Sequence, residues 1–149
     1  MDDNALKRPF GLTLLAILWF FAGLLNAFWS FQDISVYYQI LPYLSSPLYI
    51  HEWFKFAIPV GLGLSVAILG LSLLQLVIVP GLLLGKPYSY KPTLIVSILF
   101  VIVNVLMTML YTSAPAGLNG GSDLVFPALS VGIGMFWVIV YLIYLPNPT

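Results

Sequence analysis

The side chains that could carry out chemistry in this sequence are few and widely spaced. The chain contains five Asp or Glu residues, five Lys or Arg residues, one histidine and no cysteine. The absence of cysteine excludes thiol catalysis, iron–sulfur clusters and zinc–thiolate sites, and it leaves the redox compartment undetermined. The carboxylates lie near the termini and in connections, so no pair is placed to act as general acid and base. These residues argue against a stand-alone enzyme.

His51 is the single imidazole, and it stands beside Glu52 and Trp53 in an aromatic segment. With Glu52 it could complete a metal or cofactor site supplied mainly by another subunit, but a lone histidine in such a segment is more often a hydrogen-bonded structural residue. We therefore predict no metal site and no cofactor. If the chain does bind a cofactor, its candidate contact residues are His51, Trp53 and Asn104.

Three amide side chains, those of Asn26, Gln75 and Asn104, fall within apolar stretches. They could line a polar path for a neutral solute, and hydrogen bonds between helices explain them as well. No Asp, Glu, Lys, Arg or His lies within a predicted membrane span, although ion and proton pathways usually need buried ionisable groups. Ion-coupled transport by this chain alone is therefore not expected.

These residues must be positioned by membrane-spanning helices, because the composition does not fit a water-soluble protein. Hydrophobic residues make up 61% of the 149 residues, charged residues make up 7%, and the mean hydropathy is +1.05. Four spans of roughly 20 residues with their connections would use the whole chain, so we expect a single domain. The net charge is +0 and the basic residues are scattered, which argues against a nucleic-acid partner.

The apolar stretches predict an all-α membrane protein in which four transmembrane helices form an antiparallel bundle. The predicted spans cover residues 10–31, 56–84, 93–112 and 124–145. The connection over residues 32–55 is rich in aromatic residues and too apolar for a free loop. We expect it to form two short helices along the membrane surface, one over Ile34–Leu41 and one that begins at Ser46 and Pro47.

The second predicted span carries no charge from Phe56 to Gly85, and its small and polar residues fall on two opposite helix faces. One face holds Gly61, Ser65, Ser72 and Gln75, and the other holds Gly63, Ala67 and Gly70. Small residues mark helix contacts in lipid, so we expect a neighbour on each face. The first and fourth spans carry similar residues. The predicted helix or partner contacts are Gly23, Asn26, Gly63, Gly70, Gln75, Asn104, Gly132 and Gly134.

The basic residues that flank the spans predict the orientation of the chain. Lys7, Arg8, Lys86 and Lys91 lie on one side of the predicted bundle, and Lys55 alone lies on the other. Basic residues accumulate on the cytoplasmic side of a membrane. We therefore predict a multi-pass protein of the plasma membrane with both termini in the cytoplasm.

The stretch from Lys7 to Leu24, KRPFGLTLLAILWFFAGL, resembles the start of small, uncharacterised four-span membrane proteins of archaea and bacteria. The shared features are a basic residue, then Pro-x-Gly-x-Thr, then an apolar run with a later glycine. More distantly, the layout is similar to the DoxX-like four-span family, some members of which are linked to quinone-dependent sulfur oxidation. The resemblance covers one span and implies the four-span layout, without a reaction that can be assigned to particular residues.

Two functions are compatible with these features. The sequence favours a non-catalytic accessory or structural subunit of a larger membrane complex, because it has more small-residue faces than one bundle needs and no catalytic groups. The alternative is a small carrier or binder of a neutral or lipophilic molecule such as a quinone or lipid, lined by Asn26, Gln75, Asn104 and aromatic residues. The expected partners are the lipid bilayer and other membrane subunits.

Overall fold

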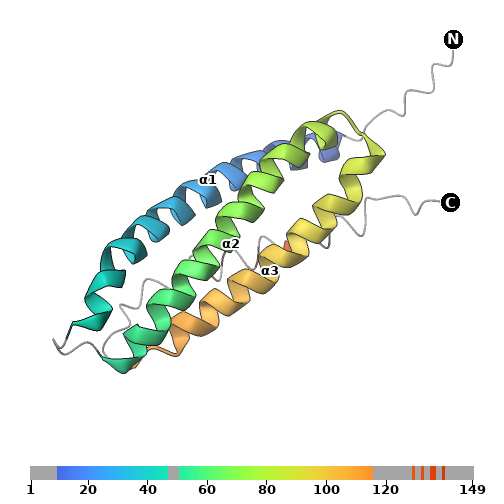
Figure 1. Ribbon diagram of the computed structural model, residues 1–149. Helices are drawn as coiled ribbons and strands as arrows, with labels where there is room; N and C mark the ends of the chain where they lie inside the picture. The colour runs from blue at the N-terminus through green and yellow to red at the C-terminus, as the bar shows by residue number, and fades with distance from the viewer. Residues whose placement is uncertain are drawn as a thin grey trace, which may run out of the picture.

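Three long helices lie side by side in an elongated bundle (Figure 1). The computed structural model describes residues 10–46 and 51–115, together with Leu129, Gly132, Met135, Phe136 and Ile139. The long helices are α1 (Phe10–Ile40), α2 (Glu52–Leu83) and α3 (Tyr90–Thr112). Two 3-10 helices, η1 (Leu41–Ser45) and η2 (Pro87–Ser89), accompany them, and the described residues contain no β-strand.

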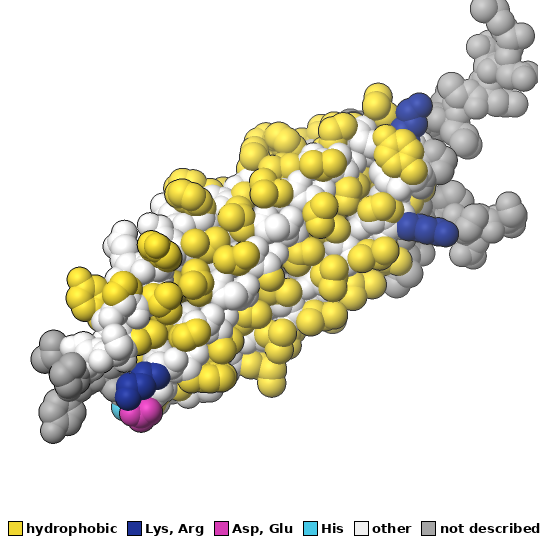
Figure 2. Space-filling view, in the orientation of Figure 1, with side chains coloured by type: hydrophobic (Ala, Val, Ile, Leu, Met, Phe, Trp, Pro, Cys, Tyr) yellow, Lys and Arg dark blue, Asp and Glu magenta, His cyan; other side chains and the backbone are white. Residues whose placement is uncertain are grey.

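Each of the three helical stretches is long and apolar enough to cross a membrane. These stretches are Thr13–Ser45, Glu52–Leu83 and Tyr90–Thr112. Figure 2 shows hydrophobic side chains over the middle of the visible face, while the coloured Lys, Glu and His side chains lie at the two ends. Exposed residues such as Leu25 (59%) and Val77 (75%) are unfavourable in water and favourable against lipid. The described residues therefore form a helical bundle consistent with a membrane protein.

Helix α1 continues well beyond the predicted first span. The sequence predicts a span that ends at Phe31 and a separate surface helix over Ile34–Leu41, whereas the structure has one unbroken helix to Ile40. No glycine or proline lies between Gly23 and Pro42, so nothing in this stretch forces the helix to stop. The residue before a proline disfavours the α conformation, and α1 gives way to η1 at that point. The first predicted surface helix is thus the last part of α1.

Helix α2 begins at Glu52, ahead of the predicted start of the second span at Phe56. His51 is its N-cap residue, because His51 Nδ1 accepts a hydrogen bond from the Trp53 backbone N–H at 3.1 Å. Glu52 places a carboxylate in the first turn, where the helix dipole favours negative charge. The second predicted surface helix, which runs from its N-cap Ser46 towards the second span, lies outside the described residues over 47–50, and residues 52–55 belong to α2.

A tight turn joins α2 to α3 and sets the two helices antiparallel. Gly85 adopts a φ of 61°, which suits glycine, and the Lys86 backbone N–H donates to the Gly81 carbonyl at 2.9 Å. Ser89 Oγ donates to the Lys86 carbonyl at 2.7 Å. A Cβ atom at Gly81 would lie 2.9 Å from Ser89 Cβ, so only glycine permits this close approach.

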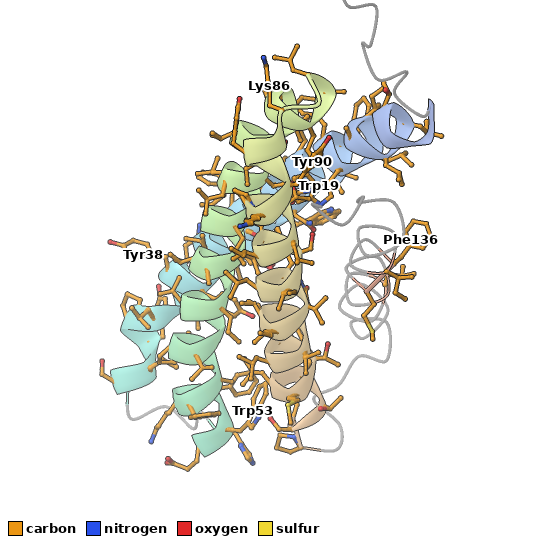
Figure 3. The ribbon with its side chains drawn as sticks, turned by 90° about the vertical axis from the view of Figure 1, so that its right-hand side faces the viewer. Trp19, Tyr38, Trp53, Lys86, Tyr90 and Phe136 are labelled. Atoms are coloured by element: carbon orange, nitrogen blue, oxygen red, sulfur yellow. The ribbon has the colours of Figure 1, made fainter. Side chains whose placement is uncertain are left out.

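Helix α2 packs against both α1 and α3. Figure 3 shows Trp53 at one end of the bundle and Lys86 and Tyr90 at the other; we call these the Trp53 end and the Lys86 end. One apolar cluster forms around Trp19 and contains Ala16, Trp19, Leu71, Val79, Leu82, Val96 and Phe100. A smaller cluster lies against Trp53 and contains Ala57, Met107 and Leu110. These two clusters hold the three helices together.

The predicted fourth span, residues 124–145, lies outside the described residues except at five positions. Leu129, Gly132, Met135, Phe136 and Ile139 are helical and exposed. The part of the chain that the structure describes therefore contains three helices that could span a membrane, and the fourth span stays a prediction.

Candidate functional site

The three helices meet at Tyr37 near the Trp53 end. The hydroxyl oxygens of Tyr37 on α1 and Tyr111 on α3 lie 3.2 Å apart, within hydrogen-bond distance. The Tyr37 ring also lies against Gly61 of α2, where a Cβ atom would be 2.9 Å from Tyr37 Cζ. Glycine at position 61 therefore makes room for the phenol that links α1 to α3.

Asp33 lies on the same face of α1 as Tyr37, one helical turn away. It is half-buried, it interacts electrostatically with Tyr37, and it falls within the stretch Thr13–Ser45 that can span a membrane. Ser30, one further turn along this face, is fully buried. The sequence predicts no ionisable residue inside a span; α1 continues past Phe31, so Asp33 lies within one continuous helix with the first predicted span.

Ser65 of α2 lies level with Asp33. Tyr37 contacts Gly61, and α1 and α2 are antiparallel (Figure 1). Asp33 precedes Tyr37 by one turn and Ser65 follows Gly61 by one turn, so both are displaced from this contact in the same direction. Ser65 is 0% exposed, and its Oγ has no hydrogen-bond partner among the described residues. Ser72, on the same face, instead donates to the backbone carbonyl one turn before it at 2.7 Å. We call Asp33, Tyr37, Ser65 and Tyr111 the Asp33 cluster.

Within the described part of the chain, no basic side chain forms an ion pair with Asp33. Lys55 pairs with Glu52 at 2.7 Å on the exposed surface of the Trp53 end. The other described basic residues, Lys86 and Lys91, flank the turn at the opposite end of α2 (Figure 2). An ionisable residue inside a membrane helix is costly unless it has a partner, and it commonly marks a functional site.

A second polar position lies deeper, where Gln75 joins α2 to α1. Gln75 is 2% exposed, and its Nε2 donates to the Trp19 backbone carbonyl at 2.6 Å. Gly23 permits this contact, because a Cβ atom there would lie 3.2 Å from Gln75 Cδ. The Gln75 Oε1 atom is buried without a hydrogen-bond partner among the described residues. Figure 3 shows Trp19 where α1 passes the other two helices.

The three candidate cofactor contacts do not form one site. His51 and Trp53 are neighbours: His51 caps α2, and Trp53 Nε1 donates to Ser113 Oγ at 3.1 Å, which ties α2 to the end of α3. Asn104 is buried farther along α3, about 14 Å from Ser113 by helix rise. Its Nδ2 donates to the Phe100 carbonyl of its own helix at 2.8 Å. His51, Trp53 and Asn104 thus make structural contacts.

The two predicted small-residue faces of α2 have different environments. Gly61, Ser65, Ser72 and Gln75 are all buried in the bundle. Gly63, Ala67 and Gly70 are exposed, and a Cβ atom at Gly63 or Gly70 would have no atom within 4 Å.

The remaining predicted contact residues follow a similar division. On α1, Gly23 is buried and Asn26 is half-buried. In the predicted fourth span, Gly132 is exposed and a Cβ atom there would meet nothing within 4 Å. Gly134 lies outside the described residues.

Comparison with known proteins gives no relative for this chain. No known protein family, curated protein or solved structure matches it. The resemblance to small four-span proteins and to the DoxX-like layout therefore stays a prediction. Among the described residues, no three His, Cys, Asp or Glu side chains are grouped so that they could hold a metal ion.

The Asp33 cluster is the part of the site that sequence reasoning missed. The aromatic composition of residues 32–55 indicated a surface connection, and that assignment placed Asp33 and Tyr37 outside the first predicted span. The signal that could have placed them is the lack of glycine or proline between Gly23 and Pro42. An extended helix puts Asp33 and Tyr37 four residues apart on one face.

Proposed function

We propose that this protein is a non-catalytic accessory subunit of a larger membrane complex, and that the exposed face of α2 binds the partner subunit. The observation that supports this proposal is the row formed by Gly63, Ala67 and Gly70, which is exposed although α2 already packs against α1 and α3. In lipid, small residues permit close backbone approach, and packing rather than apolar burial drives helix association. A partner helix on this row would give α2 neighbours on both faces.

The proposed protein has four spans and lies in the plasma membrane with both termini in the cytoplasm. Lys86 and Lys91 at one end of α2, against Lys55 at the other, support this orientation through the preference of basic residues for the cytoplasmic side.

The test is mild-detergent purification from the native membrane, followed by native mass measurement. The wild type should leave the membrane with unrelated subunits in fixed stoichiometry, whereas Gly63→Leu and Gly70→Leu should be recovered without them. Val105→Leu is the matched control, because it adds bulk at an exposed position of α3. A wild type that is purified alone, or leucine variants that keep every subunit, would contradict the proposal.

A second candidate function is the binding of a neutral or lipophilic molecule such as a quinone or lipid. The observation that favours it is the buried Gln75 Oε1, an acceptor that no described residue satisfies. A ligand hydroxyl or amide could donate to this atom. In the same mass measurement, this candidate predicts a bound quinone or lipid on the wild type that Gln75→Leu loses.

A further inference from the structure

Asp33 raises an electrostatic question that neither proposed function answers. Tyr37 is joined to Tyr111 in the last turn of α3, and Asp33 lies one turn deeper, about 6 Å along α1. At that depth a carboxylate without a positive partner is unfavourable, because the low dielectric does not replace its hydration. No described basic side chain supplies that partner.

Two hydroxyl groups lie on the buried helix faces near the level of Asp33. Ser65 lies at the same level on α2, and its buried Oγ has no partner among the described residues; Tyr37 lies one turn towards the Trp53 end. The described neighbourhood brings no thiolate or imidazole to this level, since the sequence has no cysteine and His51 caps α2. Carboxylate and hydroxyl oxygens suit hard cations such as alkali metal ions.

The single carboxylate of Asp33 favours a monovalent cation over a divalent one. One carboxylate neutralises a monovalent cation, whereas a divalent ion would leave a net positive charge in the same low-dielectric surroundings. Tyr37 and Asp33 are half-buried, whereas Ser65 at the level of Asp33 and Ser30 one turn farther along α1 are buried.

We propose that Asp33, Tyr37 and Ser65 bind one small monovalent cation inside the membrane, at the level of Ser65, which lies about 18 Å along α2 from Trp53. The cation neutralises the Asp33 carboxylate and accepts the Ser65 hydroxyl oxygen as a ligand. It thereby links α1 to α2 at the level where Tyr37 already links α1 to α3. This binding site is separate from the exposed face of α2 and does not depend on the accessory-subunit proposal.

The experiment measures thermal unfolding of the purified full-length protein in one detergent at constant ionic strength, with the salt series repeated at several pH values. Sodium chloride or potassium chloride replaces choline chloride stepwise, and equilibrium binding of radioactive sodium gives the stoichiometry. The wild type should become more stable with saturation and bind one ion per chain. Asp33→Asn should lose both effects, and in choline chloride it should be at least as stable as the wild type. Ser65→Ala should raise the half-saturating concentration several-fold.

Glu52→Gln is the matched control, because it removes a carboxylate from the same end of the bundle but from an exposed ion pair. It should keep the cation dependence of the wild type. Three outcomes would overturn the proposal: no saturable effect of sodium or potassium, an unchanged effect in Asp33→Asn, or a wild type whose stability responds to pH alone. The last outcome would show that Asp33 is neutralised by a proton instead.

Discussion

A buried amide joins two membrane helices at Gln75, and its two polar atoms have opposite effects on stability. The Nε2 atom stabilises the fold through a 2.6 Å hydrogen bond to the Trp19 carbonyl, while the buried Oε1 atom has no partner among the described residues. A typical hydrogen bond contributes about 1 kcal/mol, and an unsatisfied buried polar atom costs about 1–3 kcal/mol. The side chain's shape therefore matters at least as much as its polarity.

This balance gives a prediction for two substitutions at position 75. Gln75→Met keeps the length of the side chain and removes both polar atoms, so we expect the free energy of unfolding to change by less than about 1 kcal/mol. Gln75→Ala leaves a cavity against Gly23 and should cost roughly 2–4 kcal/mol. Denaturant or thermal unfolding in one detergent measures both. Equal losses in the two variants would show that Oε1 has a partner, such as a bound molecule.

Sequence reasoning identified the buried polar residues of α2 but not the Asp33 cluster, and the reason is physical. Ser72 and Gln75 lie in a long apolar stretch, where a polar side chain is conspicuous and must face protein. Asp33 and Tyr37 lie among aromatic residues, which occur both near the ends of membrane helices and in segments along the membrane surface. Composition alone cannot separate these cases.

At the scale of helices, α2 was the easiest element to predict and α1 the hardest. The faces of α2 followed from 3.6-residue periodicity, which places Gly61 and Ser65 opposite Gly63 and Gly70. The end of α1 depends on where the membrane surface lies along the helix, and neither periodicity nor hydropathy gives that level. The sequence also does not reveal which face of α2 receives α1, since both faces carry small residues.

The two faces of α2 predict opposite effects for one chemical change. Gly61→Ala places a Cβ atom 2.9 Å from Tyr37 Cζ, and the ring must move away from Tyr111, so we expect a loss of about 1–2 kcal/mol. Gly63→Ala is the matched control: its Cβ meets nothing within 4 Å, and alanine's higher helix propensity should leave stability unchanged or raise it by up to about 1 kcal/mol.

Thermal unfolding of both variants beside the wild type provides the measurement. In a Tyr37→Leu background, Gly61→Ala should cost much less stability than it does in the wild type, because the crowded ring is then absent. Identical melting temperatures for the two alanine variants would show that Tyr37 does not occupy the space above Gly61.

At the scale of the whole molecule, the Lys and Glu side chains visible in Figure 2 lie at the two ends, with an apolar surface between them. Helix α2 separates these ends, with Ser45 near its start and Tyr88 beyond its last turn. A helix of this length and apolarity exceeds the roughly 30 Å of a hydrocarbon layer, so its two flanking segments should lie on opposite sides of the membrane.

The proposed orientation assigns a side to each flanking segment, and the chain is well suited to a direct test because it contains no cysteine. Ser45→Cys and Tyr88→Cys each introduce one thiol at an exposed position, 72% exposed for Tyr88. Lys86 and Lys91 flank Tyr88, and basic residues are retained in the cytoplasm. A membrane-impermeant thiol reagent should therefore label the cysteine at position 45 in intact cells. It should label the cysteine at position 88 only after permeabilisation. The wild type, which has no cysteine, is the control. The reverse pattern would invert the orientation, and labelling of both in intact cells would show that α2 does not cross the membrane.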